Sequence, residues 1–309
     1  MEGAKKPIVV VGSINMDLVA NTPRIPAAGE TLLGRDFQTH HGGKGANQAV
    51  AVGRLGYPVS MIGRVGDDAF GEQLRAGLQN AGVDTSAVVT SPGASGVAVI
   101  VVAESGENSI VVVPGANSLV SASDLDNHLE KIRSAGMVLA QLEIPLETVF
   151  HLAAVCAREG VPLVLDPAPA AELSGELLKN VAWFTPNETE AAFFLRDAAG
   201  SSDVATGQGL IDKGVQGVVL KLGARGAYVA STDGVNESIQ PFQVRAVDTT
   251  AAGDCFNGAF AVGMLMGKGP VGSARFAAAA AAISVTRAGA QSSMPTLDEV
   301  MNKIDTAND

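Results

Sequence analysis

Short apolar runs alternate along the chain with longer segments that have helical spacing. The first run, residues 8–12, is rich in β-branched side chains and ends in glycine, which is typical of a buried parallel strand. Further runs of this kind occupy residues 59–63, 137–142, 162–165, 182–185 and 217–222. Helical spacing is found between them, at residues 46–55, 69–80, 146–159 and 204–213. This alternation predicts an α/β fold with a central, mostly parallel sheet flanked by helices.

Two segments interrupt the alternation. Residues 16–41 carry several prolines and glycines and have no convincing helical pattern, and residues 95–115 hold two apolar stretches around a polar, glycine-containing turn. The second segment predicts a β-hairpin. Together the two segments predict a small antiparallel sheet inserted into the α/β core. Such a sheet needs a cover for its apolar face, which could be a ligand or a second subunit.

The last third of the chain is predominantly helical. Residues 251–266 and the alanine-rich stretch 271–286 each predict a helix, and alanine permits close packing between helices or against a ligand. We find no internal repeat and no long linker, so residues 1–309 are expected to form a single domain, with the inserted sheet at about 16–41 and 95–115.

Composition and charge narrow the class of protein. Hydrophobic residues make up 47% of the chain, enough for a sizeable core, and the net charge of −11 without a Lys/Arg cluster argues against a nucleic-acid partner. The two cysteines, Cys156 and Cys255, cannot form a disulfide framework. The apolar run near the N-terminus is too short for a signal peptide or a membrane span, so we expect a cytoplasmic protein without a membrane partner.

The segment 248–254, Asp-Thr-Thr-Ala-Ala-Gly-Asp, contains the strongest candidate chemistry. Small residues at Ala251, Ala252 and Gly253 leave backbone N–H groups free at a predicted helix start, which favours binding of an anion. Asp254 follows in the first turn, where it could accept a proton from a hydroxyl that receives a phosphoryl group. Alternatively, Asp254 only complements the helix dipole, which by itself would lower its pKa.

Polar residues near two other predicted element ends could bind a small molecule. Gly43, Lys44, Gly45 and Asn47 open the predicted helix at 46–55 and could bring its backbone close to a ligand, or they could simply form a glycine-rich helix start. This segment lacks the Walker A spacing. Asn15 and Asp17 follow the first strand, where ligands bind in open α/β sheets, and could bind sugar hydroxyls or serve as turn residues.

Two further segments suit a nucleotide. Asn187 and Glu190 follow a predicted strand and could order water around Mg²⁺ and phosphates, although a helix N-cap explains them equally well. In the loop 221–226, Gly223 and Gly226 could admit a flat or phosphorylated ligand, or could only form a tight turn.

Taken in order along the chain, these motifs resemble the PfkB family of carbohydrate kinases over essentially the whole length. The resemblance rests on residues 12–17, 42–49, 66–68, 187–190 and 248–254, and the segments Gly-Gly-Lys-Gly-Ala-Asn and Ala-Ala-Gly-Asp are the most specific. It implies transfer of the γ-phosphoryl group of ATP to O5 of D-ribose, with Mg²⁺ and activation by a monovalent cation, usually K⁺. It also implies that the inserted sheet is a lid that closes over the sugar and pairs with the lid of a second subunit in a homodimer.

The resemblance assigns roles to individual residues. Asp254 matches the catalytic base, with Ala251, Ala252 and Gly253 as its anion hole. Sugar-binding positions are matched by Asn15, Asp17, Gly43, Lys44, Gly45, Asn47, Glu143 and Asp254. ATP-binding positions are matched by Asn187, Glu190, Lys221, Gly223, Ala224, Arg225, Gly226, Gly253 and Ala278. The loop for the monovalent cation is matched by Asp248, Thr250, Ser284, Arg287, Gly289 and Ser293, largely through backbone oxygens.

Two positions depart from the family pattern. Ala278 stands where relatives often have a larger polar residue beside the adenine, which could alter nucleotide affinity. Cys255, next to the proposed base, often aligns with threonine, and we hypothesise that a thiol reagent would block the site there. The alternatives are a related kinase for deoxyribose, fructose or a nucleoside, and a sugar-binding protein without catalysis. The absence of a Gly-x-Gly-x-x-Gly motif argues against a dehydrogenase.

Overall fold

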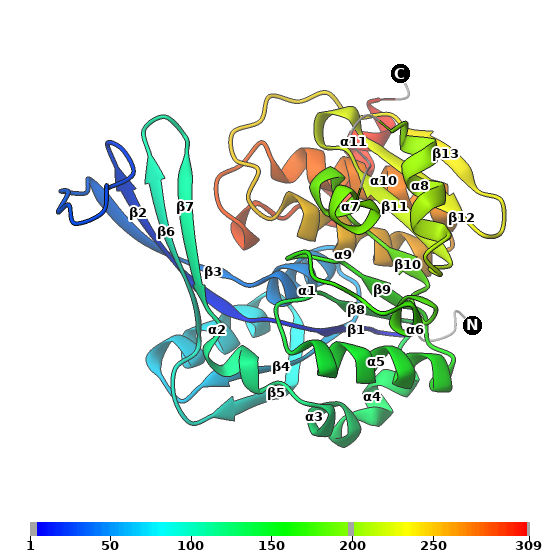
Figure 1. Cartoon of the computed structure of the whole chain (residues 1–309), viewed down its shortest axis with the longest axis horizontal. Coiled ribbons are helices and arrows are strands. Elements are labelled where there is room, and N and C mark those ends of the chain that lie inside the picture. Colours follow the sequence, from blue (N-terminus) through cyan, green and yellow to red (C-terminus); the bar gives the residue numbers. More distant parts are fainter. Residues whose placement is uncertain (1–4, 197–200, 308–309) are drawn as a thin grey trace.

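The computed structural model describes residues 5–196 and 201–307, and its centre is a nine-stranded sheet (Figure 1). The strand order is β13-β12-β11-β10-β9-β8-β1-β4-β5. The strands from β11 to β5 in this order pair in parallel, and β12 and β13 run antiparallel at one edge. The bounds are β1 (Ile8–Val11), β4 (Val59–Gly66), β5 (Val83–Ser91), β8 (Met137–Ala140), β9 (Leu163–Leu165), β10 (Trp183–Phe184), β11 (Gly217–Lys221), β12 (Ala227–Ser231) and β13 (Asn236–Ile239).

Helices cover both faces of this sheet and enclose two hydrophobic cores. β1 shows why, since Ile8 and Val10 point into one core while Val9 and Val11 point into the other. The first core is closed by α1 (Lys44–Arg54), α2 (Ala69–Asn80), α9 (Ala252–Leu265), α10 (Gly269–Ser284) and α11 (Leu297–Asp305). The second is closed by α3 (Ala122–Asn127), α4 (Leu129–Ser134), α5 (Leu146–Glu159), α6 (Gly175–Leu178), α7 (Glu188–Leu195) and α8 (Asp203–Ile211).

A second sheet of four strands projects from the body of the molecule (Figure 1, upper left). Its order is β3-β2-β6-β7, with bounds β2 (Asn15–Thr22), β3 (Asp36–Gly42), β6 (Gly96–Ala103) and β7 (Asn108–Val113). The β6–β7 pair is the hairpin that residues 95–115 predict. The pairs β2–β3 and β6–β7 are antiparallel, whereas β2 and β6 pair in parallel, so the sheet is mixed. The parallel pairing arises because both strands leave the body in the same direction.

The predicted α/β architecture is confirmed, and each predicted strand of the central sheet overlaps an observed one. The edge strand β5 was not predicted, because its side chains alternate between buried and exposed and therefore form no continuous apolar run. The strand β13 and the helix α11 were not predicted either, nor were the short helices α3, α4 and α6, which offer few periodic positions to detect. Within residues 5–196 and 201–307, no helix is long and apolar enough to cross a membrane.

Candidate active site

Asp254 lies in the first turn of α9, faces α1 and is only 5% exposed. Its Oδ2 accepts a hydrogen bond from Asn47 Nδ2 at 3.0 Å, and its Oδ1 accepts one from Gln48 Nε2 at 3.2 Å. Burial raises the pKa of Asp254 above its ordinary value, and nearby Asp166 adds to the rise, while Lys44 opposes it. The expectation of a lowered pKa is therefore wrong, because the loss of hydration outweighs the effect of the helix start.

The start of α9 has the geometry of an anion site, with one difference from the prediction. Ala251 adopts the left-handed conformation, with φ of 57°, which costs a non-glycine residue about 1 kcal/mol. The N–H groups of Gly253 and Asp254 have no hydrogen-bond partner within the described residues. Ala252 differs from the prediction, because its N–H donates to Thr249 O at 3.2 Å and so stabilises the preceding turn.

Asn15 and Asp17 lie on one face of β2, where alternate residues point the same way. Asp17 packs directly over Gly42, since a Cβ there would lie 2.2 Å from Asp17 Oδ2. Burial raises the pKa of Asp17 to about 7, and the negative charges of Glu143 and Asp254 contribute to this rise. The structure therefore brings Asp17 close enough to the predicted base, Asp254, for their charges to interact, and Asn15 lies on the same strand face as Asp17.

Lys44 and Glu143 complete this cluster. Glu143 Oε2 accepts hydrogen bonds from Ser13 Oγ at 2.5 Å and from the backbone N–H of Lys44 at 3.1 Å. Burial alone would lower the pKa of Lys44, but Asp254, Asp166, Glu143 and Glu190 together raise it. The Lys44 ammonium group thus stays positively charged among carboxylates.

The glycines that precede and begin α1 serve different purposes. Gly43 has φ of 85°, and a Cβ there would lie 2.7 Å from the backbone N of Asn15, so only glycine fits beside the sugar-motif strand. A Cβ on Gly45 would lie 2.7 Å from Ser13 N and from Gly12 C. Gly45 therefore allows α1 to pack closely on the segment after β1, which is a packing role.

Asp166 is a charged residue of the site that the pattern analysis missed. It is 2% exposed, lies after β9, and accepts hydrogen bonds from Lys221 Nζ at 2.9 Å and from Gln48 Nε2 at 3.0 Å. Gln48 is held in turn by Gln141, whose Nε2 donates to Gln48 Oε1 at 2.8 Å. Gln48 thereby links Asp254 to Asp166 and Lys221. The position of Asp166 at the carboxyl end of a predicted parallel strand was the signal that could have identified it.

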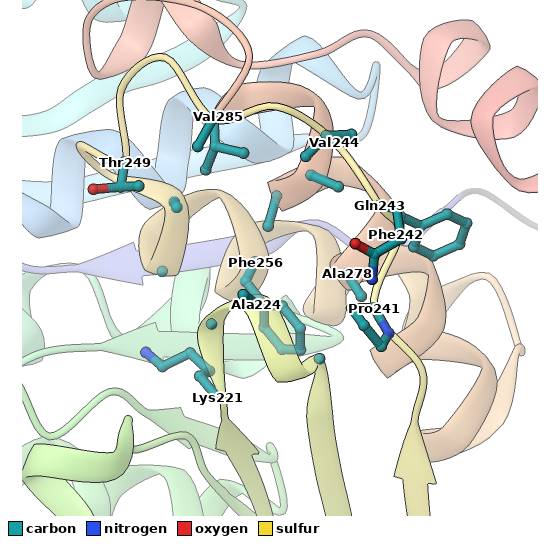
Figure 2. Close-up of a pocket in the computed structure, with 17 residues that line it drawn as sticks. Lys221, Ala224, Pro241, Phe242, Gln243, Val244, Thr249, Phe256, Ala278 and Val285 are labelled. Carbon is teal, nitrogen blue, oxygen red and sulfur yellow. The ribbon is translucent and has the colours of Figure 1, made fainter.

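A cavity of about 310 Å³ opens beside the start of α9 (Figure 2). Predicted ATP-binding residues that line it are Lys221, Gly223, Ala224, Gly226, Gly253 and Ala278. Figure 2 shows Phe256 and Ala278 close to the segment Pro241–Val244, which the pattern analysis missed because it lies in a loop without periodicity. The lining is mostly apolar, and Figure 2 shows Lys221 and Thr249 together on one side of the cavity, which suits a flat ring with a charged tail.

Gly226 is required by this cavity's geometry. Its φ is 91°, and a Cβ there would lie 2.1 Å from Ile239 O. Arg225 does not line the cavity. Its guanidinium group forms ion pairs with Glu188 at 2.8 Å and with Asp203 at 2.9 Å, at the surface.

Asn187 and Glu190 form a reciprocal cap at the start of α7. Asn187 Oδ1 accepts from the Glu190 N–H at 2.8 Å, and Glu190 Oε2 accepts from the Asn187 N–H at 2.7 Å. The backbone of Asn187 also forms an isolated parallel β-bridge with Lys221 of β11. Burial raises the pKa of Glu190. The capping interpretation of this motif is therefore correct, and the cap places the Glu190 carboxyl near Lys221 and Asp166.

The six residues matched to a cation loop lie around the turn that precedes α9 and the segment that follows α10. Asp248 Oδ1 accepts from Thr250 N at 2.9 Å and from Thr250 Oγ1 at 2.6 Å, and Asp248 Oδ2 accepts from Gly289 N at 2.8 Å. The Ser284 hydroxyl donates to Ala281 O within α10, and the Ser293 hydroxyl donates to Ala290 O, just before the 3₁₀ turn Gln291–Ser293. These hydrogen bonds hold the turn that precedes α9 against the segment that follows α10.

Arg287, the remaining residue of that loop, forms an ion pair with Glu299 of α11.

Cys255 is 1% exposed, and burial raises the pKa of its thiol to about 12. Such a thiol is inaccessible and protonated at neutral pH. The hypothesis that a thiol reagent blocks the site through Cys255 is therefore not supported by the geometry.

Comparison with known proteins identifies the family of this chain. Residues 5–297 match the model of the pfkB family of carbohydrate kinases, and the chain belongs to that family. It is 44% identical over 306 residues to a ribokinase of Haemophilus influenzae, covering 98% of this chain and 100% of the relative.

Solved ribokinases have the same fold. The structure of a ribokinase from Thermotoga maritima has a TM-score of 0.89 and 35% identity, covering 96% of this chain and 99% of that one. A ribokinase of Arabidopsis thaliana, solved in complex with ribose and ATP, has a TM-score of 0.88 and 36% identity, covering 97% of this chain and 98% of that one.

Proposed function

We propose that this protein phosphorylates D-ribose at O5 with ATP as the donor, giving ribose 5-phosphate and ADP. The observation that carries the proposal is the position of Asp254. Its carboxylate lies in the helix turn whose amides border the 310 Å³ cavity, and it interacts electrostatically with Asp17 of the sugar motif. The identity of 44% to a ribokinase over almost the whole chain adds to this support.

The chemistry follows from this arrangement. Asp254 accepts the proton of the sugar hydroxyl as the oxygen attacks the γ-phosphorus, and the bond from that phosphorus to the bridging oxygen of ADP breaks. The raised pKa of Asp254 makes it a better proton acceptor than an ordinary carboxylate. The free N–H groups of Gly253 and Asp254 stabilise negative charge on the transferred group, and Lys221 and Lys44 bring positive charge to the same region.

Mg²⁺ and K⁺ are parts of the same proposal. Within the described residues no group of three or more His, Cys, Asp or Glu side chains is arranged to hold a metal. Mg²⁺ is therefore expected to arrive with ATP and to be held through water near Glu190, and it neutralises phosphate charge when bound. K⁺ is expected at the Asp248 turn, where its charge would reinforce the anion site at the start of α9.

We also propose that the four-stranded sheet acts as a lid over the sugar and pairs with the lid of a second copy. Its strand β7 is exposed along its whole length, with Ile110, Val111, Val112 and Val113 each about half exposed. A cytoplasmic location completes the proposal, supported by the two free cysteines.

The test is a panel of sugars in a coupled assay of ADP release, with and without K⁺. D-ribose, 2-deoxyribose, fructose and adenosine are compared at equal concentrations, and the product of the best substrate is identified by ³¹P NMR. The proposal predicts the highest kcat/KM with ribose, a 5-phosphate product, and higher activity with K⁺. Preference for another compound would assign the chain to a related kinase, and sugar binding without ADP release would indicate a non-catalytic protein.

A further inference from the structure

Asn117 is a buried polar residue for which the sequence suggests no role. It lies in the 3₁₀ helix η1 (Gly115–Leu119), directly after β7, and is 1% exposed. All three hydrogen bonds of its side chain go to the segment that begins β2. Oδ1 accepts from the Ile14 N–H at 2.9 Å, and Nδ2 donates to Ile14 O at 3.2 Å and to Asn15 Oδ1 at 2.7 Å.

These contacts fix the orientation of two amide groups. A backbone N–H can only donate, so the atom of Asn117 that faces Ile14 N must be its oxygen. The other branch of Asn117 is then the NH₂ group, and the atom of Asn15 that receives it must be Oδ1. The amide of Asn15 is thus oriented by the backbone of its own neighbour, through Asn117.

The orientation leaves the NH₂ group of Asn15 available. Asn15 is 3% exposed, and its Nδ2 has no hydrogen-bond partner within residues 5–196 and 201–307. This nitrogen is not among the fully buried polar atoms that lack a partner, so it keeps a small area open to a ligand. Asn15 shares a strand face with Asp17, which is an acceptor when ionised. The same face therefore presents a donor and an acceptor two residues apart.

Gly96 makes room for the amide pair. A Cβ on Gly96 would lie 2.2 Å from Asn117 Nδ2 and 2.2 Å from Asn15 Oδ1. Gly96 is the first residue of β6, and it pairs with Asn15 in register. The Asn15–Asn117 contact is therefore built into the point where the four-stranded sheet joins the body.

We propose that Asn117 is a positioning residue that sets sugar specificity, by orienting Asn15 so that it presents two N–H donors to the substrate. This inference rests on the proposed function and adds to it a specific requirement. The sugar must place one hydroxyl oxygen, with a free lone pair, at Asn15 Nδ2. A neighbouring hydroxyl of the sugar must donate a hydrogen bond to Asp17. A sugar that lacks that hydroxyl leaves the donor unpaired in a buried site, which is why it is rejected.

The test is Asn117→Asp, which keeps the shape of the side chain but removes its donors. The carboxylate still accepts from Ile14 N, and Asn15 must turn its NH₂ group toward it, presenting Oδ1 to the sugar. We expect the KM for ribose to rise at least about tenfold, with kcat and the KM for ATP within about twofold. The ratio of kcat/KM for ribose to kcat/KM for the deoxy sugar should become smaller than in wild type for either 2-deoxyribose or 3-deoxyribose, whichever lacks the hydroxyl that binds Asn15. In the variant that hydroxyl of ribose has no partner, so having it brings no advantage.

Ser118→Ala is the matched control in the same turn, since Ser118 Oγ donates to Gly115 O and does not touch Asn15. It should leave all three kinetic constants unchanged. The inference is overturned if Asn117→Asp leaves the KM for ribose unchanged, or if it raises the KM for ribose and ATP in parallel. Wild-type protein that releases no ADP with ribose would instead refute the proposed function.

If Asn117→Asp does not fold, the wild-type protein still tests the inference. The side-chain amide signals of Asn15 can be assigned in a ¹⁵N–¹H spectrum by their loss in Asn15→Asp. Saturating ribose should shift them, whereas the amide signals of Asn117 should stay nearly in place. Asn15 signals that do not respond to bound ribose would overturn the inference.

Discussion

Replacement of Asp17 by asparagine should make the protein more stable and its sugar site weaker. Burial, together with Glu143 and Asp254, raises the pKa of Asp17 from 3.8 to about 7. The folded state therefore binds this proton more tightly than the unfolded chain does. The stability that this proton contributes is fully present below pH 3.8 and is lost as the pH rises through about 7.

The magnitude follows from the same two values. The pKa of Asp17 rises from 3.8 to about 7, and each pH unit of such a rise is worth about 1.4 kcal/mol. Ionised Asp17 therefore lowers the free energy of unfolding at pH 8 by about 4 kcal/mol. Asparagine resembles the protonated carboxyl, so Asp17→Asn should recover up to about 4 kcal/mol at pH 8 and little at pH 4. The same change removes a charged acceptor from the proposed sugar site and should raise the KM for ribose by about tenfold or more.

Urea unfolding of both proteins at pH 4, 6 and 8 measures the stability difference, and steady-state kinetics measures the KM. The control is Asp126→Asn, which alters a solvent-exposed carboxylate on α3 and should show no comparable pH-dependent gain. A stability difference between Asp17→Asn and wild type that does not grow with pH would refute the reasoning about burial and neighbouring charge.

Three further predictions concern the nucleotide and cation sites. Asp166→Asn removes the charge partner of Lys221 and should lower kcat/KM for ATP about 10- to 100-fold, and an unchanged value would exclude this role. Ala278→Leu fills part of the 310 Å³ cavity and should raise the KM for ATP severalfold while leaving the KM for the sugar unchanged, whereas parallel changes would count against ATP binding there. Asp248→Ala frees Thr250 N and Gly289 N and should abolish activation by K⁺ in the ADP-release assay, so retained activation would place the cation elsewhere.

The strands at the centre of the fold could be predicted because their sequence is simple. β1 and β8 are buried on both faces, so each appears as a continuous apolar run. β5 could not be predicted in this way, because one of its faces meets solvent and its apolar residues are separated by polar ones. The parallel pairing of β2 with β6 could not be predicted either, because the two strands lie about eighty residues apart in the sequence. Asn15 of β2 pairs with Gly96 of β6.

The site was predictable where one short segment carries several of its groups. A helix start with small residues can be recognised from the sequence of residues 251–254 alone, and a glycine-rich segment that lets the backbone come close to a ligand can be recognised from residues 43–47. The link from Gln48 to Asp166 and Lys221 could not be read from the sequence, since it depends on three elements meeting in space. The pKa of Asp254 was predicted in the wrong direction for the same reason, because burial is a property of the folded structure.

The most direct test of the central claim is the rate of ribose-dependent ADP release by Asp254→Asn, measured beside wild type at equal protein and saturating substrates. The asparagine oxygen can still accept from Asn47, and Gln48 keeps Asp166 as an acceptor, so the variant should fold and bind ribose. The account predicts a kcat lower by about 10²- to 10⁴-fold, the usual contribution of a general base. A folded variant with turnover within a few-fold of wild type would contradict it.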